Sequence, residues 1–270
     1  MPGIDRRTAR RRFDRAAPTY SEAARLEAEV ATRILERLDS LRLAPRRILD
    51  AASGPPARAL GKRYPGAQVI ALDFALQMLK PRGFQWFRRS PLLVCAELER
   101  LPLAAEAIDF TWCNMALHWV TDPLPALREF ARVLVPEGLL MFSTLGPDTL
   151  KELRAAAGAS RVHSFTDMHD LGDMLVAAGF TAPVMDMEML DIAYRDPAAL
   201  LADLRASGQT SARADRPRGL TGRRYGEALR AKLGPKATFE VVYGHAWKAG
   251  RKDPDVEPAQ KTVRVFKRMP

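Results

Sequence analysis

The sequence has few cysteines and no long apolar run. Cys95 and Cys113 are its two cysteines among 270 residues, and their spacing matches no metal-ligand motif. We expect two reduced thiols buried in strands of a cytoplasmic protein. No apolar run approaches the roughly 18 residues of a membrane span, and no apolar secretory segment follows the arginine-rich start. The sequence therefore predicts neither a disulfide scaffold nor a membrane protein.

Acidic residues are also scarce relative to basic ones. There are 32 Asp and Glu against 42 Lys and Arg, which gives a net charge of +10. The arginines are scattered and no nucleic-acid-binding motif accompanies them, so we expect no nucleic-acid partner. A small acidic protein would suit this charge, although a merely solvated basic surface is an open alternative. We expect a monomer.

Apolar runs typical of strands alternate with helical segments along the chain. This alternation predicts an α/β fold with a mostly parallel sheet covered by helices on both faces. The last two strands, joined by an insertion, would complete seven strands with one antiparallel strand at the edge. The predicted strands are 46–51, 67–72, 92–95, 108–113, 138–144, 183–192 and 237–246. The predicted helices are 5–40, 56–64, 75–81, 123–134, 148–157, 167–178, 197–207 and 222–233.

These elements predict a single domain over residues 1–247. A helical cap at 10–40 precedes the first strand, and an insertion at 193–236 forms a helical lid between the last two strands. Within the insertion, the polar segment 207–224 reads as a mobile connection. Residues 248–270 form a basic tail that we expect to be flexible.

The first strand-turn-helix-strand unit, Ile48 to Asp73, is typical of nucleotide-binding sheets. Ligands of such sheets lie at the carboxyl ends of the strands, where an acid ending the second strand can accept bonds from ribose hydroxyls. Asp73 stands at that position. The turn at 52–56 is not G-x-G-x-x-G, and no arginine is placed for a second phosphate, so a methyltransferase using S-adenosylmethionine is favoured over a nicotinamide enzyme.

Longer motifs make the comparison specific. "FDRAAPTY" (13–20), "VIALDFALQML", "CAELERLPL" and "CNMALHW" match successive family segments, and "STLGPDTL" with "FTDMHDLGD" is the most distinctive pair. Over roughly residues 10–247 the chain resembles the malonyl-acyl-carrier-protein O-methyltransferases of biotin synthesis. The resemblance implies a Rossmann-like class I fold, an S-adenosylmethionine cofactor, and malonyl carried on acyl carrier protein as the substrate. The cofactor-binding residues that it implies are Tyr20, Asp50, Ala52, Gly54, Asp73, Phe74, Glu97, Leu98 and Asn114.

The turn departs from the family pattern at two positions. Ala52 replaces a glycine, and its methyl group crowds the backbone and disfavours a positive φ. Pro56 replaces another glycine and removes an N–H, although it can also start the next helix. Glu97 replaces an aspartate and can still accept from an adenine amino group. These changes leave open a non-catalytic protein that kept the fold and lost or weakened cofactor binding.

The expected reaction requires no general base. The malonyl carboxylate is ionised at neutral pH, so alignment with the methyl donor and exclusion of water are the main requirements. No residue is therefore assigned as certainly catalytic; Tyr20 is the one candidate. A bidentate cation suits the substrate carboxylate, and Arg195, Arg223 and Arg224 are candidates. A small-molecule methyltransferase that does not use a carrier protein is a further alternative.

Overall fold

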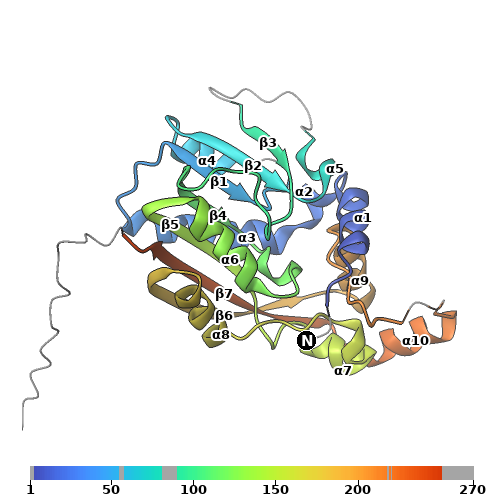
Figure 1. Ribbon diagram of the computed structural model, residues 1–270. Coiled ribbons are helices and arrows are strands. Elements are labelled where there is room, and N and C mark those ends of the chain that lie inside the picture. The colour runs from blue at the N-terminus through green and yellow to red at the C-terminus, as the bar shows by residue number, and fades with distance from the viewer. Residues whose placement is uncertain (1–2, 55–57, 81–89, 218, 220, 251–270) are drawn as a thin grey trace, which may run out of the picture.

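The computed structural model describes residues 3–54, 58–80, 90–217, 219 and 221–250. Its centre is a seven-stranded sheet in the order β3-β2-β1-β4-β5-β7-β6 (Figure 1). The strands are β1 Arg47–Ala51, β2 Gln68–Asp73, β3 Leu92–Cys95, β4 Ile108–Cys113, β5 Leu134–Leu145, β6 Phe180–Ala193 and β7 Lys236–Lys248. Strands β1 to β5 pair in parallel, and β7 runs antiparallel to both β5 and β6. The predicted fold class is confirmed, and its antiparallel strand lies next to the edge strand β6.

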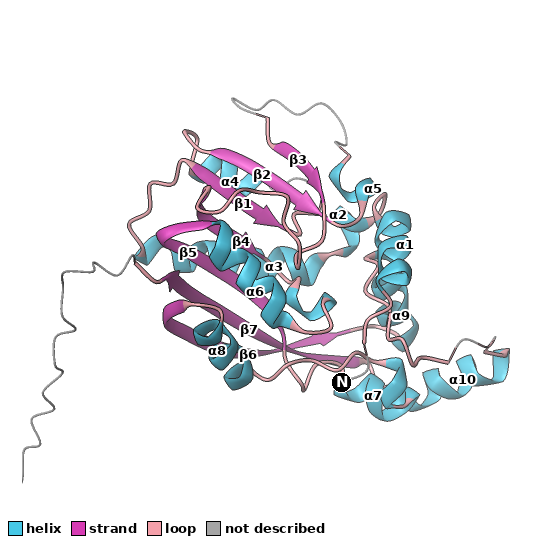
Figure 2. Ribbon diagram, in the orientation of Figure 1, coloured by secondary structure: helices cyan, strands magenta, loops and turns pink. Residues whose placement is uncertain are grey.

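Helices cover both faces of this sheet. The α-helices are α1 Arg6–Ala16, α2 Tyr20–Ala23, α3 Arg25–Arg37, α4 Arg58–Arg63, α5 Leu76–Leu79, α6 Pro123–Val133, α7 Lys151–Ala157, α8 Met168–Ala177, α9 Pro197–Ala206 and α10 Arg223–Lys232. The described residues also form the short 3-10 helices η1 Leu38–Ser40, η2 Leu117–Trp119 and η3 Ala159–Arg161. In Figure 2, α6 and α8 lie on one face and α3 lies on the other.

The core divides into two layers because strand side chains alternate between the faces. In β5, Leu139 and Met141 join the cluster that contains Ile34 of α3. Leu140 and Phe142 join the cluster that contains residues of α6. Strands that are buried on both faces consist of continuous apolar runs, which is why the sequence predicted the positions of the buried strands closely.

The N-terminal helical region differs from its prediction. The expected helix over 5–40 is broken into α1, α2, α3 and η1. Pro18 lies in the break after α1. Ala17 before it still has helical dihedral angles, but Pro18 has no backbone N–H with which to continue the helical hydrogen bonds. The break turns α1 across the carboxyl ends of the strands (Figure 1).

The segment predicted to be a mobile connection is instead packed along residues 207–216. Ser207, Ala212 and Arg213 are buried. The backbone N–H of Asp5 donates to the carbonyl of Ala212 at 2.7 Å, and that of Ala214 donates to the carbonyl of Gly3 at 2.8 Å. The segment therefore exchanges backbone hydrogen bonds with the chain entering α1, whereas its mobility stays a prediction.

Cys95 also differs from its prediction, whereas Cys113 is buried as expected. Cys95 ends β3, the edge strand of the described sheet, and its side chain is exposed. An edge strand is covered less completely than a central one, which local sequence does not reveal.

Candidate functional site

The turn after β1 is held against the end of β2. Ser53 donates its backbone N–H to the carbonyl of Leu72 at 2.9 Å, and Gly54 donates to Oδ2 of Asp73 at 3.0 Å. Ala52 has φ +59° and Gly54 has φ +60°. The left-handed conformation at Ala52 is the one that its Cβ disfavours. Pro55 and Pro56 lie outside the described residues.

Asp73 is fixed and buried at the carboxyl end of β2. Its side chain accepts from the backbone N–H of Gly54 and, through Oδ1, from that of Ala75 at 2.8 Å. Burial raises the pKa of this carboxyl to about 6 despite those hydrogen bonds. Each carboxylate oxygen can accept more than one bond, so Asp73 is still able to accept from a ligand hydroxyl.

An aromatic cluster covers this position from the side of α1. The ring of Phe13 lies edge-on to the rings of Phe74 and Trp119, and its centroid is 5.6 Å and 4.8 Å from theirs. The ring centroid of Tyr20 is 6.4 Å from that of Phe13. Burial raises the pKa of the Tyr20 phenol well above its usual value. Beneath the cluster lies a cavity of about 50 Å³. Eight of the nine predicted cofactor residues line it: Tyr20, Ala52, Gly54, Asp73, Phe74, Glu97, Leu98 and Asn114.

The ninth predicted residue, Asp50, lines an adjoining groove of about 270 Å³ together with Ser53. Tyr20, Ala52 and Asn114 line both spaces. The Ser53 hydroxyl is buried and has no hydrogen-bond partner among the described residues. The structure therefore brings all nine predicted residues around two adjoining spaces at the carboxyl ends of the strands.

Two of these side chains have their polar atoms engaged. Glu97 accepts from Arg10 of α1 at 2.6 Å. Asn114 donates to the carbonyl of Glu27 at 3.0 Å and accepts from the hydroxyl of Ser143 at 2.8 Å. Asn114 therefore connects α3 to β5.

A larger cavity of about 550 Å³ lies beyond the carboxyl end of β5. Trp119 and Gln209 line both this cavity and the small one beneath α1, so they mark the junction of the two. Buried His118, His163 and Phe165 form part of its inner wall. A reactant in the large cavity would meet a cofactor at this junction.

The two inner-wall imidazoles are neutral at physiological pH. Nε2 of His163 accepts from the backbone N–H of Ala212 at 2.7 Å, and burial lowers its pKa to about 4. Burial, followed by the neighbouring His163, lowers the pKa of His118 to about 3. The inner end of the cavity therefore carries no imidazolium charge.

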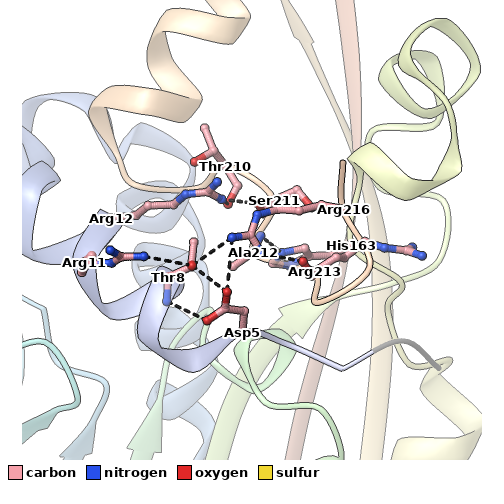
Figure 3. Close-up of polar contacts among 10 residues, drawn as sticks. All are labelled: Asp5, Thr8, Arg11, Arg12, His163, Thr210, Ser211, Ala212, Arg213 and Arg216. Atoms are coloured by element: carbon pink, nitrogen blue, oxygen red, sulfur yellow. Dashed lines mark hydrogen bonds and ion pairs between the residues drawn. The ribbon is translucent and has the colours of Figure 1, made fainter. Parts of the chain in front are cut away.

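Segment 207–216 and α1 together form one wall of the site (Figure 3). Arg12 donates to the carbonyls of Thr210 and Ser211. Arg216 donates to the hydroxyl of Thr8 at 2.9 Å and to Asp5 at 3.2 Å. These contacts place the residues that precede Ala212, including Gln209, at the junction.

Sequence reasoning missed Gln209 and its partner Glu27. Nε2 of Gln209 donates to Oε1 of Glu27 at 2.6 Å. Glu27 is buried, and desolvation raises its pKa to about 7. The two residues are 182 positions apart in no recognisable motif. The one local signal was an acid on the apolar face of a predicted helix.

The three candidate arginines occupy different places. Arg195 lines the large cavity. Arg223 pairs with Glu227 on α10 at 2.8 Å, and its side chain is 92% exposed. Arg224 is also exposed, and neither it nor Arg223 lines a described cavity. Arg223 and Arg224 are therefore exposed on α10, apart from the described cavities, and their contact with a substrate carboxylate stays a prediction.

Two further features are absent from the described residues. No cluster of histidine, cysteine and acidic side chains has the arrangement of a metal site. None of the described helices combines the length and apolar character needed to cross a membrane.

Comparison with known proteins relates this site to a family. A family model described as "Methyltransferase domain" matches residues 49–142. The malonyl-[acyl-carrier protein] O-methyltransferase of Methylovorus sp. (strain MP688) is 49% identical over 267 residues, covering 91% of this chain and 90% of that protein. The corresponding protein of Laribacter hongkongensis (strain HLHK9) is 48% identical over 266 residues, covering 90% of each chain.

A solved structure supports the fold independently. A SAM-dependent methyltransferase from Thermotoga maritima superimposes with a TM-score of 0.53 at 18% identity, covering 89% of this chain and 99% of that chain. This likeness concerns the fold, whereas the two relatives above are alike in sequence over nearly their whole length. The chain therefore belongs to the malonyl-[acyl-carrier protein] O-methyltransferase family.

Proposed function

We propose that this protein transfers a methyl group from S-adenosylmethionine to the free carboxylate of a malonyl thioester carried on acyl carrier protein, an early step of biotin synthesis. The observation that carries the proposal is the junction at Trp119 and Gln209 between the cofactor-side cavity and the 550 Å³ cavity. Family membership supports the same reaction, because the relatives bear that name.

The residues around the cofactor-side spaces fit S-adenosylmethionine. Asp73 would accept from the ribose hydroxyls, and Leu98 would pack against the adenine. The positive-φ turn at Ala52 and Gly54 brings the backbone close to the ligand, and the unpartnered hydroxyl of Ser53 could donate to its methionyl end. When bound, S-adenosylmethionine supplies an electrophilic methyl carbon on a sulfonium.

The protein's own contribution is alignment and the exclusion of water. A malonyl carboxylate has a pKa near that of aspartic acid, so it enters as the ionised nucleophile and no side chain must take a proton. Trp119 and the buried inner wall keep water away from the junction, and a fixed approach of two reactants lowers the entropic barrier. The neutral imidazoles leave the carboxylate without a tight ion pair that would reduce its nucleophilicity.

A methyl-transfer assay tests this proposal. The protein is incubated with S-adenosylmethionine and malonyl-acyl carrier protein, and mass spectrometry detects the methyl ester. Acetyl-acyl carrier protein is the matched control, because it has no free carboxylate. Methylation of free malonate or malonyl-CoA, with no gain from the carrier, would instead support the small-molecule alternative.

Calorimetry with S-adenosylmethionine addresses the non-catalytic alternative. The small volume beneath α1 and the strained Ala52 are the observations that favour it. Absence of binding at millimolar ligand, unchanged by Ala52→Gly together with Pro56→Gly, would contradict the proposed function. Growth of a biotin auxotroph that lacks its own methyltransferase gives a cellular readout of the same activity.

A further inference from the structure

Among the described residues, three arginines line the 550 Å³ cavity, and all three are at least partly exposed to solvent. Arg25 begins α3, Arg161 ends η3, and Arg195 follows β6. Arg25 and Arg195 are exposed and Arg161 is partly exposed, whereas His118 and His163 are buried. This gradient in exposure places the positive charge at the mouth of the cavity and neutral groups at its inner end.

These guanidinium groups are available to a ligand. Among the described residues, Arg25 and Arg195 make no side-chain hydrogen bond or ion pair, and Arg161 lies over the ring of Tyr225 at 4.8 Å. Elsewhere, Arg33 and Arg213 are paired with carboxylates. Free arginines at a cavity mouth suit an anion, because guanidinium donates in a planar fork to carboxylate or phosphate.

The three arginines outnumber the two acidic residues of the same cavity. Glu27 and Asp203 also line it. Glu27 is buried and accepts a hydrogen bond from Gln209, which leaves Asp203 as the one acid of this lining that accepts no side-chain hydrogen bond among the described residues. Arg25 is the first residue of α3, and Ala24 before it makes no side-chain capping hydrogen bond. The positive end of the helix dipole therefore adds to the positive electrostatic potential at the cavity mouth.

The substrate carboxylate is not the anion that these arginines suit. Methyl transfer requires that carboxylate at the Trp119–Gln209 junction, where the wall is buried and the imidazoles are neutral. A thioester on acyl carrier protein has a second anion at the other end of its arm, the phosphodiester of phosphopantetheine. Leu26, Ile192 and Leu204 give the cavity apolar walls that suit the arm between those ends.

We propose that Arg25, Arg161 and Arg195 bind the phosphate of the phosphopantetheine arm at the cavity mouth, while the malonyl end reaches the inner junction. This inference rests on the proposed function, and it reassigns Arg195 from the substrate carboxylate to the phosphate. It makes these arginines determinants of specificity for carrier-linked substrates.

Two substrates that differ by one phosphate test the inference. Values of kcat/KM are measured with malonyl-phosphopantetheine and with malonyl-pantetheine for the wild type, Arg25→Ala, Arg195→Ala and the double variant. Arg230→Ala, exposed on α10 and away from the cavity, controls for the loss of one positive charge. We expect the double variant to lose about tenfold or more with the phosphorylated substrate and less than about twofold with the other.

Equal losses with both substrates, or no loss with either, would overturn the inference. Malonyl-acyl carrier protein is measured as a third substrate, and a loss confined to it would show that the arginines contact the carrier's protein surface instead, which also overturns the inference. Binding of unacylated phosphopantetheine and pantetheine by calorimetry gives a readout without methyl transfer. If no malonyl thioester is methylated, the proposed function fails, whereas binding of phosphopantetheine that is lost in the double variant would still support the phosphate site.

Discussion

At position 52, an alanine takes a backbone conformation that glycine adopts freely. Its φ of +59° brings Cβ close to the following carbonyl oxygen, which disfavours the folded turn by about 1 kcal/mol. We expect Ala52→Gly to raise the free energy of unfolding by about that amount, measured by urea denaturation, and to leave S-adenosylmethionine binding intact. The control is Ala155→Gly on the exposed face of α7, which should lower stability by a similar amount because glycine disfavours helix. Stabilisation by both changes, or by neither, would contradict this reading of the turn.

Glu27 predicts a pH dependence of stability. Burial raises its pKa from 4.5 to about 7 in the folded state. Between those values the folded protein holds more protons than the unfolded chain, so stability falls as the pH rises through this range. Glu27→Gln removes this contribution, and we expect its stability relative to the wild type to rise by about 1–3 kcal/mol between about pH 5 and pH 8.

Denaturation midpoints at the two pH values measure the difference. Asp73, which also titrates in this range, is present in both proteins and cancels. Glu29→Gln, at an exposed position on the same helix, should show no such change. A Glu27→Gln variant whose stability runs parallel to that of the wild type at both pH values would contradict the assignment.

At the scale of elements, the contact of α1 with segment 207–216 depends on Gly208. This residue has φ +77°, and an added Cβ would lie 3.1 Å from Cδ1 of Phe13 and 3.2 Å from Cβ of Ala16. We expect Gly208→Ala to destabilise the protein by about 1–2 kcal/mol and to speed hydrogen exchange in α1. Gly222→Ala is the matched control, because its added Cβ would meet nothing within 4 Å. Unchanged exchange in α1 with Gly208→Ala would show that the segment does not hold the helix.

The positions of the strands could be predicted from the sequence, whereas the positions of several site residues could not. The strands were found because β1 and β5 are apolar on both faces, and Asp73 was found because its distance from the turn is fixed by one strand-turn-helix unit. Gln209 was not predictable, because its place depends on hydrogen bonds between 207–216 and α1, which are far apart in sequence. The exposure of Arg223 and Arg224 was not predictable either, because the position of a residue in a helix does not show which face of that helix meets a cavity. The resemblance supplied the family, but tertiary contacts decided which of its candidate cations line the site.

For the whole molecule, the net charge of +10 gives a prediction about its partner. A basic protein and an acidic carrier attract each other over distances that salt screens, with a Debye length of about 10 Å at 0.1 M. Raising salt from about 50 mM to about 500 mM should therefore lower kcat/KM for malonyl-acyl carrier protein by about tenfold or more. Malonyl-pantetheine, which carries the same reacting group without the acidic protein, should change by less than about twofold. Steady-state kinetics give kcat/KM for both substrates at the two salt concentrations. An equal loss of kcat/KM with the two substrates would mean that salt acts on the protein itself and that the basic surface is only solvated.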